Sequence, residues 1–172
     1  MNQPQKSVLF YEEQRFRQWW LWLVIIIPFF ATLFGVSMDL LRTEDANQAA
    51  EKAIALVAVI VIWIVIGFVV WWIRMLTVVR ADGLYIKFLP FIWKEKKIDL
   101  DEFNAMRAGQ YRPLVEYGGW GIRYGWKRKA YNVMGNQGVE LHRPDKSILL
   151  IGSQRPRELA EAIASISHLE SA

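Results

Sequence analysis

Seven basic side chains stand in three short stretches of the chain and could bind an anion. They are Lys94, Lys96, Lys97, Arg123, Lys127, Arg128 and Lys129. Lysine and arginine donate charge-assisted hydrogen bonds to phosphates and carboxylates, and bases close to a membrane attract anionic lipid by roughly 1 kcal/mol each. The chemistry expected of these residues is therefore contact with a lipid headgroup or with an acidic partner protein.

Two simpler roles remain open for the same residues. Each basic run could be the solvated face of a strand, because strand side chains alternate between the two faces of a sheet. Arg123 ends the stretch GGWGIR, whose glycines permit unusual backbone conformations. It could hold a carboxylate or a phosphate there, or it could pair with a structural acid beside a bend.

Residue types needed for catalysis or metal binding are scarce in this chain. There is no cysteine, and the two histidines, His142 and His168, lie far apart without metal-ligand spacing. Asp99, Asp101 and Glu102 fit a turn better than an acid/base pair. No phosphate-binding loop, nucleophile elbow or zinc-protease motif occurs. We therefore expect a protein that is not an enzyme and uses no cofactor or metal.

Two long apolar runs indicate that the chain is anchored in a membrane. Residues 19–36 and 53–73 contain no charged side chain. A helix as long as the second run rises about 30 Å, the thickness of the hydrocarbon core of a bilayer. Residues 37–52 form a short polar connector, with Thr43 or Asp45 as the cap of the second helix. We expect an antiparallel transmembrane hairpin, and its uncharged spans disfavour a channel or transporter.

The charge distribution predicts the orientation of the hairpin. The connector carries a net charge of −2, whereas residues 1–18 carry +1 and residues 74–172 carry +5. Because Lys and Arg near helix ends remain on the cytoplasmic side, both termini are expected in the cytoplasm and the helices in the cell (inner) membrane. Arg15 and Arg17 contribute to this prediction just before the first helix.

Residues 1–18 are expected to form a cytoplasmic segment outside the folded domain. Phe10, Tyr11 and Phe16 could lie at the membrane surface while the charged residues between them face water. An extension of the first membrane helix is the other interpretation.

Residues 74–172 are expected to form a compact, mostly β domain. Alternating apolar residues and turn signals predict seven strands, at about 75–79, 84–88, 91–98, 103–108, 129–134, 138–142 and 147–152. Leu159, Ile163, Ile166 and Leu169 then recur with helical spacing after Pro156, which suits a first helical position. An amphipathic helix should therefore end the chain and cover one side of the sheet.

Four stretches of the chain resemble one group of small bacterial membrane proteins. They are EEQRF (12–16), YGGWGIR (117–123), AYNVMGNQGVEL (130–141) and IGSQRPREL (151–159). They resemble uncharacterised two-pass proteins with a C-terminal bacterial pleckstrin-homology-like (PH-like) domain. The resemblance implies an α+β membrane protein: a transmembrane hairpin, then a PH-like β-barrel or half-barrel of about seven strands capped by a C-terminal helix. Eukaryotic relatives bind headgroups with a basic first hairpin loop, but here that loop, residues 80–83, holds one base and one acid.

Two functions are compatible with these features. The first is a non-catalytic scaffold, assembly or regulatory protein that contacts a membrane or cytoplasmic protein, or further copies of itself. The second is an anionic-lipid-sensing module that uses the basic runs 94–97 and 127–129. Nucleic acid is not an expected partner, because the runs are small and no recognition motif accompanies them.

Overall fold

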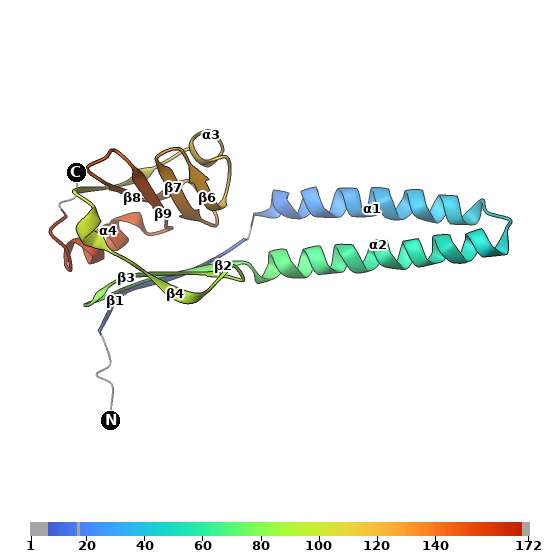
Figure 1. Cartoon of the computed structure of the whole chain (residues 1–172), viewed down its shortest axis with the longest axis horizontal. Helices are drawn as coiled ribbons and strands as arrows, with labels where there is room; N and C mark the ends of the chain where they lie inside the picture. The colour runs from blue at the N-terminus through green and yellow to red at the C-terminus, as the bar shows by residue number, and fades with distance from the viewer. Residues whose placement is uncertain (1–6, 17, 170–172) are drawn as a thin grey trace, which may run out of the picture. The chain divides into compact units, whose positions relative to one another are not determined.

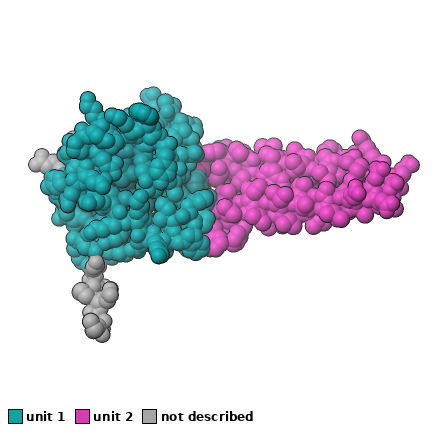
Figure 2. All heavy atoms as spheres, in the orientation of Figure 1, with its two compact units in different colours: residues 1–16, 73–172 teal, residues 17–72 magenta. Residues whose placement is uncertain are grey.

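A computed structural model of the chain describes residues 7–16 and 18–169. The chain divides into two compact units, which Figure 2 shows in different colours. Residues 1–16 and 73–172 form the first unit, here called the β-domain, and residues 17–72 form the second, here called the helical hairpin. The β-domain is therefore discontinuous in sequence, because the hairpin is inserted after its first strand.

The helical hairpin consists of α1 (Trp19–Leu41) and α2 (Ala46–Trp72), which pack side by side (Figure 1). The ring centroids of Phe29 and Trp63 lie 6.2 Å apart across the pair. Both helices are long and apolar enough to cross a membrane, and none of their described residues is buried. The predicted pair of neighbouring apolar helices is confirmed to this extent.

Both helices extend beyond the apolar runs into the predicted connector, so only residues 42–45 lie between them. Polar residues continue a helix readily, so the apolar boundary marks a possible span and not the helix end. Of the two predicted caps of α2, Asp45 is the one observed, since its Oδ1 accepts from the backbone N–H groups of Asn47 (2.8 Å) and Gln48 (3.1 Å). Lys52 forms an ion pair with Asp39 (3.0 Å), which ties the two helix ends together.

The strands of the β-domain form two sheets (Figure 1). The first sheet is antiparallel and consists, in spatial order, of β1 (Val8–Arg15), β2 (Arg74–Arg80), β3 (Gly83–Leu89) and β4 (Ile92–Ile98). The second sheet has the order β5-β8-β9-β7-β6 and consists of β5 (Ala105–Gln110), β6 (Gly121–Gly125), β7 (Arg128–Asn132), β8 (Gln137–His142) and β9 (Ile148–Gly152). Only β7 and β9 pair in parallel in this sheet.

The two sheets do not close into a barrel, which corrects that part of the expectation. β1 and β4 are the edges of the first sheet, and β5 and β6 are those of the second. Among the described residues no ladder joins an edge of one sheet to an edge of the other. The short 3-10 helix η1 (Leu100–Glu102) separates β4 from β5, so the chain leaves one sheet before it enters the next. Packing of core side chains, and not a backbone ladder, therefore holds the two sheets together.

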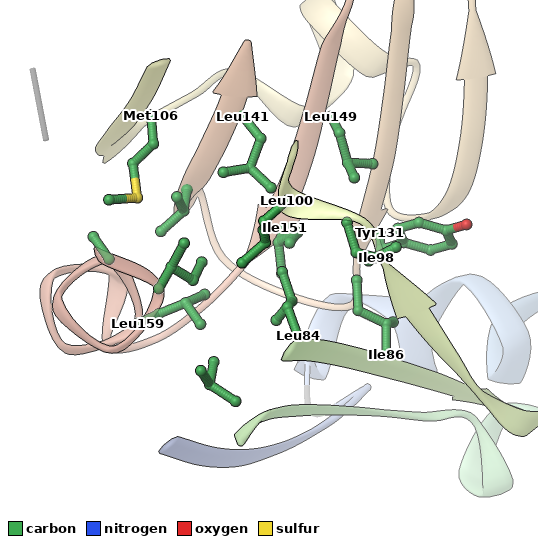
Figure 3. Packing of buried hydrophobic residues seen from close by; sticks show 14 of the residues in the cluster. Leu84, Ile86, Ile98, Leu100, Met106, Tyr131, Leu141, Leu149, Ile151 and Leu159 are labelled. Carbon is green, nitrogen blue, oxygen red and sulfur yellow. The ribbon is translucent and has the colours of Figure 1, made fainter. Parts of the chain in front are cut away.

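The hydrophobic core lies between the two sheets, as Figure 3 shows. Its fully buried members include Leu84, Ile86, Met106, Tyr131, Leu141, Ile151 and Leu159. The C-terminal helix α4 (Pro156–Ala164) contributes Leu159 and Ile163 and packs against β1, β2, β5 and β8. The predicted C-terminal helix is confirmed, with Pro156 in its first turn.

A second, smaller cluster lies on the outer face of the second sheet. It contains Tyr111, Tyr117, Ala130 and Leu150 beneath the short helix α3 (Pro113–Tyr117). Gly118 ends this helix with φ of 68°, a left-handed conformation that glycine adopts without steric cost. The helix was not predicted, although a proline at its start and a glycine after its end are the usual signals.

Residues 8–15 form strand β1, which corrects the expectation of a membrane-surface segment or an extended first helix. β1 pairs with β2, with Glu12 opposite Thr77. Phe10, Glu12 and Gln14 point into the domain and are buried, while the residues between them are exposed. Pairing with β2 satisfies backbone polar groups of this segment, and its alternate side chains enter the core. Residues 1–6 and Arg17 of the predicted segment lie outside the described residues.

The buried polar side chains of β1 hold this strand to the residues that follow β9. Glu12 accepts hydrogen bonds from Ser153 Oγ (2.6 Å) and from the backbone N–H of Gln154 (2.7 Å). Gln14 Nε2 donates to the carbonyl of Gly152 at 2.9 Å. We call Glu12, Gln14 and residues 152–155 the β1 latch. These bonds join residues at least 138 positions apart, so the latch closes the domain across the inserted hairpin.

Arg155 adds a second set of contacts to the latch. Its Nη2 donates to the carbonyl of Tyr11 at 2.6 Å, and its guanidinium carbon lies 4.8 Å from the ring centroid of Phe10. The latch also needs close backbone packing, because a Cβ at Gly152 would lie 2.8 Å from the Cβ of Asn132. The stretches EEQRF and IGSQRPREL, noted separately in the sequence, are thus two halves of one structural feature.

Candidate functional site

Strand β4 carries the first basic run along a free edge of the first sheet. Lys96 lies opposite Ile86, which is fully buried in the core. Lys96 therefore projects from the face of β4 that is turned toward the second sheet, and Lys94 lies two residues away, where the pairing with β3 is irregular. Both lysines are exposed because β4 is the last strand of its sheet.

The outer face of β4 carries a different arrangement. Glu95 accepts two hydrogen bonds from Arg80, at 2.7 Å from Nη1 and 2.9 Å from Nη2. The hydrogen bond from Arg80 is the main reason that the pKa of Glu95 lies below its usual range. Lys97 lies opposite Tyr85 on this outer face. The first predicted run is thus divided between the two faces of the strand.

Lys129 of the second basic run approaches Lys96 from the opposite sheet. Its Nζ lies 4.4 Å from the ring centroid of Tyr124 and 5.1 Å from that of Tyr131. Lys96 Nζ lies 3.5 Å from the hydroxyl of Tyr131. We call Lys96, Lys129, Tyr124 and Tyr131 the lysine rim. Two lysines from separate runs and separate sheets converge there on one tyrosine.

The electrostatics of the rim favour an anion. Burial lowers the pKa of Lys129, but hydrogen bonding to Tyr131 and Tyr124 outweighs burial and the pKa is raised overall. The hydrogen bond with Lys129 is the main cause of a lowered pKa at Tyr124. Lys129 therefore keeps its charge at neutral pH. Within the described part of the chain, no carboxylate forms an ion pair with the rim lysines.

An apolar groove adjoins the lysine rim and has a volume of about 560 Å³. Tyr124 belongs to both, because its ring lines the groove and lies beside Lys129. The other lining residues are Phe16, Ile73, Phe88, Phe91, Ile92, Trp120, Gly121 and Ile122. They come from the end of β1, the start of β2, the β3–β4 turn and β6, so the groove lies between the free edges β4 and β6.

The remaining predicted site residues lie elsewhere and have other partners. Lys127 Nζ donates to the carbonyl of Asp145 at 3.3 Å, and Arg128 pairs with Glu116 of α3 at 3.2 Å. Arg123 Nε donates to the carbonyl of Trp120 at 2.9 Å. Arg123 thus folds back onto the backbone of the glycine-rich stretch, and no acid among residues 7–16 and 18–169 forms an ion pair with it. Of the seven predicted residues, Lys96 and Lys129 belong to the rim, while Lys94 lies nearby on β4 and is exposed.

Exposed aromatic side chains accompany both basic runs and were not identified from the sequence. Phe91 and Trp93 are 65% and 63% exposed at the start of β4, and Trp126 is 92% exposed in the β6–β7 turn. A signal was present, since Trp93 and Trp126 each directly precede a lysine run. Tryptophan is enriched at the interfacial region of bilayers, and lysine can keep its charge in water while its stem covers apolar surface.

The histidines and acids do not form a metal centre among residues 7–16 and 18–169, where no group of three such side chains could hold an ion. His142 lies 3.6 Å from Glu140, and His168 lies 4.0 Å from Asp101. The acidic group at 99–102 forms the η1 turn, with Asp99 accepting from the N–H of Asp101 at 3.1 Å. The predicted turn is confirmed there.

Comparison with known proteins assigns the chain to a family. A family model described as a family of unknown function, DUF6141, matches residues 1–169. The chain belongs to this family. No curated protein and no solved structure matches the chain. The DUF6141 match includes β1, both hairpin helices and α4, so it covers both halves of the β1 latch.

Proposed function

We propose that this DUF6141 chain is a membrane-anchored, non-catalytic module whose lysine rim binds anionic lipid at the cytoplasmic membrane surface. The observation that supports this proposal is the convergence of Lys96 and Lys129 from two sheets. Each base near such a surface adds roughly 1 kcal/mol of attraction. Exposed Trp93 and Trp126, next to these lysine runs, would enter the headgroup region.

The proposed anchor is the helical hairpin. Both helices are apolar and have no buried residue. Such a large exposed apolar surface is stable only when a bilayer or another apolar surface covers it. The few bases between the helices and the excess of bases in residues 74–172 support cytoplasmic termini. In this orientation residues 42–45 lie outside the cell membrane and the β-domain lies inside.

Single cysteines can test this orientation, because the chain contains no cysteine of its own. Gln48→Cys at the start of α2 is expected to react with a membrane-impermeant maleimide in spheroplasts, whereas Lys146→Cys in the β8–β9 turn is expected to react only after the membrane is opened. Both positions are exposed, so their local accessibility is comparable. The opposite labelling pattern would reverse the orientation, and labelling of both in sealed spheroplasts would argue against any span.

A PH-like half-barrel is part of the proposal. Two sheets with a shared core and a C-terminal helix packed against both of them support it. The parallel pair of β7 and β9 is a feature that a simple antiparallel half-barrel would not contain. A solved structure that superposes on PH-like domains over both sheets and α4 is the measurement that would decide this point.

Lipid binding by the rim can be measured in the full chain, reconstituted in nanodiscs of neutral phosphatidylcholine or of a mixture with anionic phosphatidylglycerol. We expect slower hydrogen exchange in β4 and β7 in the anionic discs, and loss of this protection at high salt, because exposed charges are screened. In Lys96→Glu/Lys129→Glu the protection should disappear. Each Lys→Glu substitution removes one positive charge and adds one negative charge, so the pair changes the charge by four units and should weaken the contact by roughly 4 kcal/mol, at about 1 kcal/mol for each unit.

The matched control is Lys97→Glu/Lys146→Glu, which changes the net charge equally at exposed positions outside the rim, on the outer face of β4 and in the β8–β9 turn. It is expected to keep the protection of β4 and β7. Equal loss in both double variants would mean that net charge, and not the rim, is responsible. No difference between neutral and anionic discs in the unmodified chain would refute lipid binding by the β-domain.

A protein-binding scaffold is the second candidate function. The observation that favours it is the exposure of two adjacent apolar side chains on α3, Leu114 at 67% and Val115 at 79%. If exchange in β4 and β7 is insensitive to the headgroup while crosslinking in native membranes captures one protein at α3, the scaffold function replaces the lipid-binding one.

A further inference from the structure

We infer that the apolar groove takes one acyl chain of an anionic lipid while the lysine rim holds the headgroup of that same lipid. This inference rests on the proposed function and goes further, because surface attraction alone needs no groove. It assigns a single amphiphilic molecule to two adjoining features: an apolar groove of about 560 Å³ and a cluster of lysines beside it.

The lining of the groove fits hydrocarbon. Apart from the hydroxyl of Tyr124, its side chains offer one polar group, the indole N–H of Trp120. That group already donates to the carbonyl of Gly135 at 2.8 Å. A ligand with its own polar groups would find no side-chain partner between Phe88 and Ile122, whereas an alkyl chain needs none. Its volume lies within the range of roughly 300–1,000 Å³ usual for ligand sites.

The charge at one border of the groove defines which amphiphile fits. Tyr124 lines the groove, and Lys129 lies 4.4 Å from its ring centroid. Lys96 reaches Tyr131 from the other edge, so two ammonium groups lie where the apolar lining ends. A negatively charged headgroup placed there would be bound by both lysines, while a zwitterionic headgroup would bring its own cation into the same site.

The groove also begins where lipid would be available. Phe16 and Ile73 line it, and they are respectively three residues before α1 and directly after α2. Three residues span at most about 11 Å. If the hairpin crosses the bilayer as proposed, these lining residues lie close to the bilayer surface, because so few residues connect them to the ends of the helices. An acyl chain would then have only a short way to move, which favours membrane lipid over a soluble ligand.

The test uses the full chain in nanodiscs that contain phosphatidylglycerol with a photoactivatable diazirine near the end of one acyl chain. We expect crosslinks to peptides 88–92 and 120–124 in addition to those on α1 and α2. Ile122→Trp, which fills the groove from β6, should lower the yield at these two peptides at least about tenfold, the effect of taking two or more methylene groups out of an apolar site. Val115→Trp on exposed α3 adds the same ring elsewhere and should leave the yield unchanged.

Two further comparisons complete the experiment: one changes the headgroup of the lipid and the other changes the lysine rim. Phosphatidylcholine with the same photoactivatable chain should label the groove peptides far less, and Lys96→Glu/Lys129→Glu should abolish the labelling by phosphatidylglycerol. Crosslinks confined to α1 and α2, or equal groove labelling by the two lipids, would overturn the inference. Exchange protection of β4 and β7 that persists in Ile122→Trp separates the two proposals, because surface binding then survives when the groove is closed. Unchanged protection in the latch residues verifies that the variant is folded.

Discussion

Glu12→Ala is expected to lower the free energy of unfolding of the β-domain by about 3 to 5 kcal/mol. Glu12 is buried and accepts two hydrogen bonds, one from Ser153 Oγ and one from the N–H of Gln154. Alanine removes both bonds and leaves the buried hydroxyl of Ser153 and the partly buried N–H of Gln154 without their acceptor, beside an empty space. Because β1 is an edge strand held by this latch, the loss should also release β1 from the end of β9.

Thermal unfolding of the full chain in detergent, together with hydrogen exchange of residues 8–15, measures this effect. The matched control is Glu13→Ala on the same strand, since Glu13 points outward and pairs with Arg15 at 2.7 Å in a partly exposed position. Its cost should stay within about 1 kcal/mol, as is usual for exposed pairs. Equal costs for the two substitutions would show that the latch does not stabilise the domain.

Leu159→Ala is expected to cost about 2 to 5 kcal/mol, through lost burial and the cavity that remains. Leu159 is fully buried where α4 packs against both sheets (Figure 3). The two sheets share no backbone ladder among the described residues, and α4 packs against strands of both, so it helps the core to join them. The substitution should therefore loosen both sheets and not α4 alone.

Denaturant unfolding followed by circular dichroism, with exchange rates read separately for the two sheets, measures this second effect. Glu161→Ala is the matched control, because Glu161 is exposed on the same helix and its loss should cost within about 0.5 kcal/mol. A large loss of protection in α4 with unchanged protection in β2 and β8 would contradict a role of the helix in joining the sheets.

The discontinuous β-domain determines which part of the chain can be studied. A fragment that starts after α2 lacks β1, so β2 loses its partner strand and becomes the edge of the first sheet. It also leaves Ser153 Oγ, the N–H of Gln154 and the carbonyl of Gly152 without their partners on β1. Each unpaired buried polar group costs about 1 to 3 kcal/mol. Binding experiments on this protein therefore need the full chain.

Local patterns were sufficient for most of the secondary structure. The long apolar runs of α1 and α2, the helical spacing in α4 and the seven strands from β2 to β5 and β7 to β9 were predicted from neighbouring residues alone. The reason is that period and turn chemistry are properties of short segments. Strand β6 was missed because it is short and begins and ends with glycine, which weakens a strand signal.

β1 was missed for a different reason. Its inward-facing residues include Glu12 and Gln14, whereas apolar Leu9 and Tyr11 face outward. The usual pattern of apolar residues inside and polar residues outside is thus reversed along part of the strand. These polar groups can be buried because they form hydrogen bonds with residues 152–154. No local rule could identify partners on the far side of a long inserted hairpin.

The sequence by itself determined the two apolar helices, the β-rich domain with its C-terminal helix and the list of seven basic residues. The tertiary structure decided which of these bases act together: Lys96 and Lys129 meet at Tyr131, while Arg128 pairs with Glu116 and Arg123 binds its own backbone. It also decided that the sheets remain open and that a groove lies between β4 and β6. The physical reason is that helix and strand periods depend on adjacent residues, whereas a binding site depends on where distant strands place their side chains.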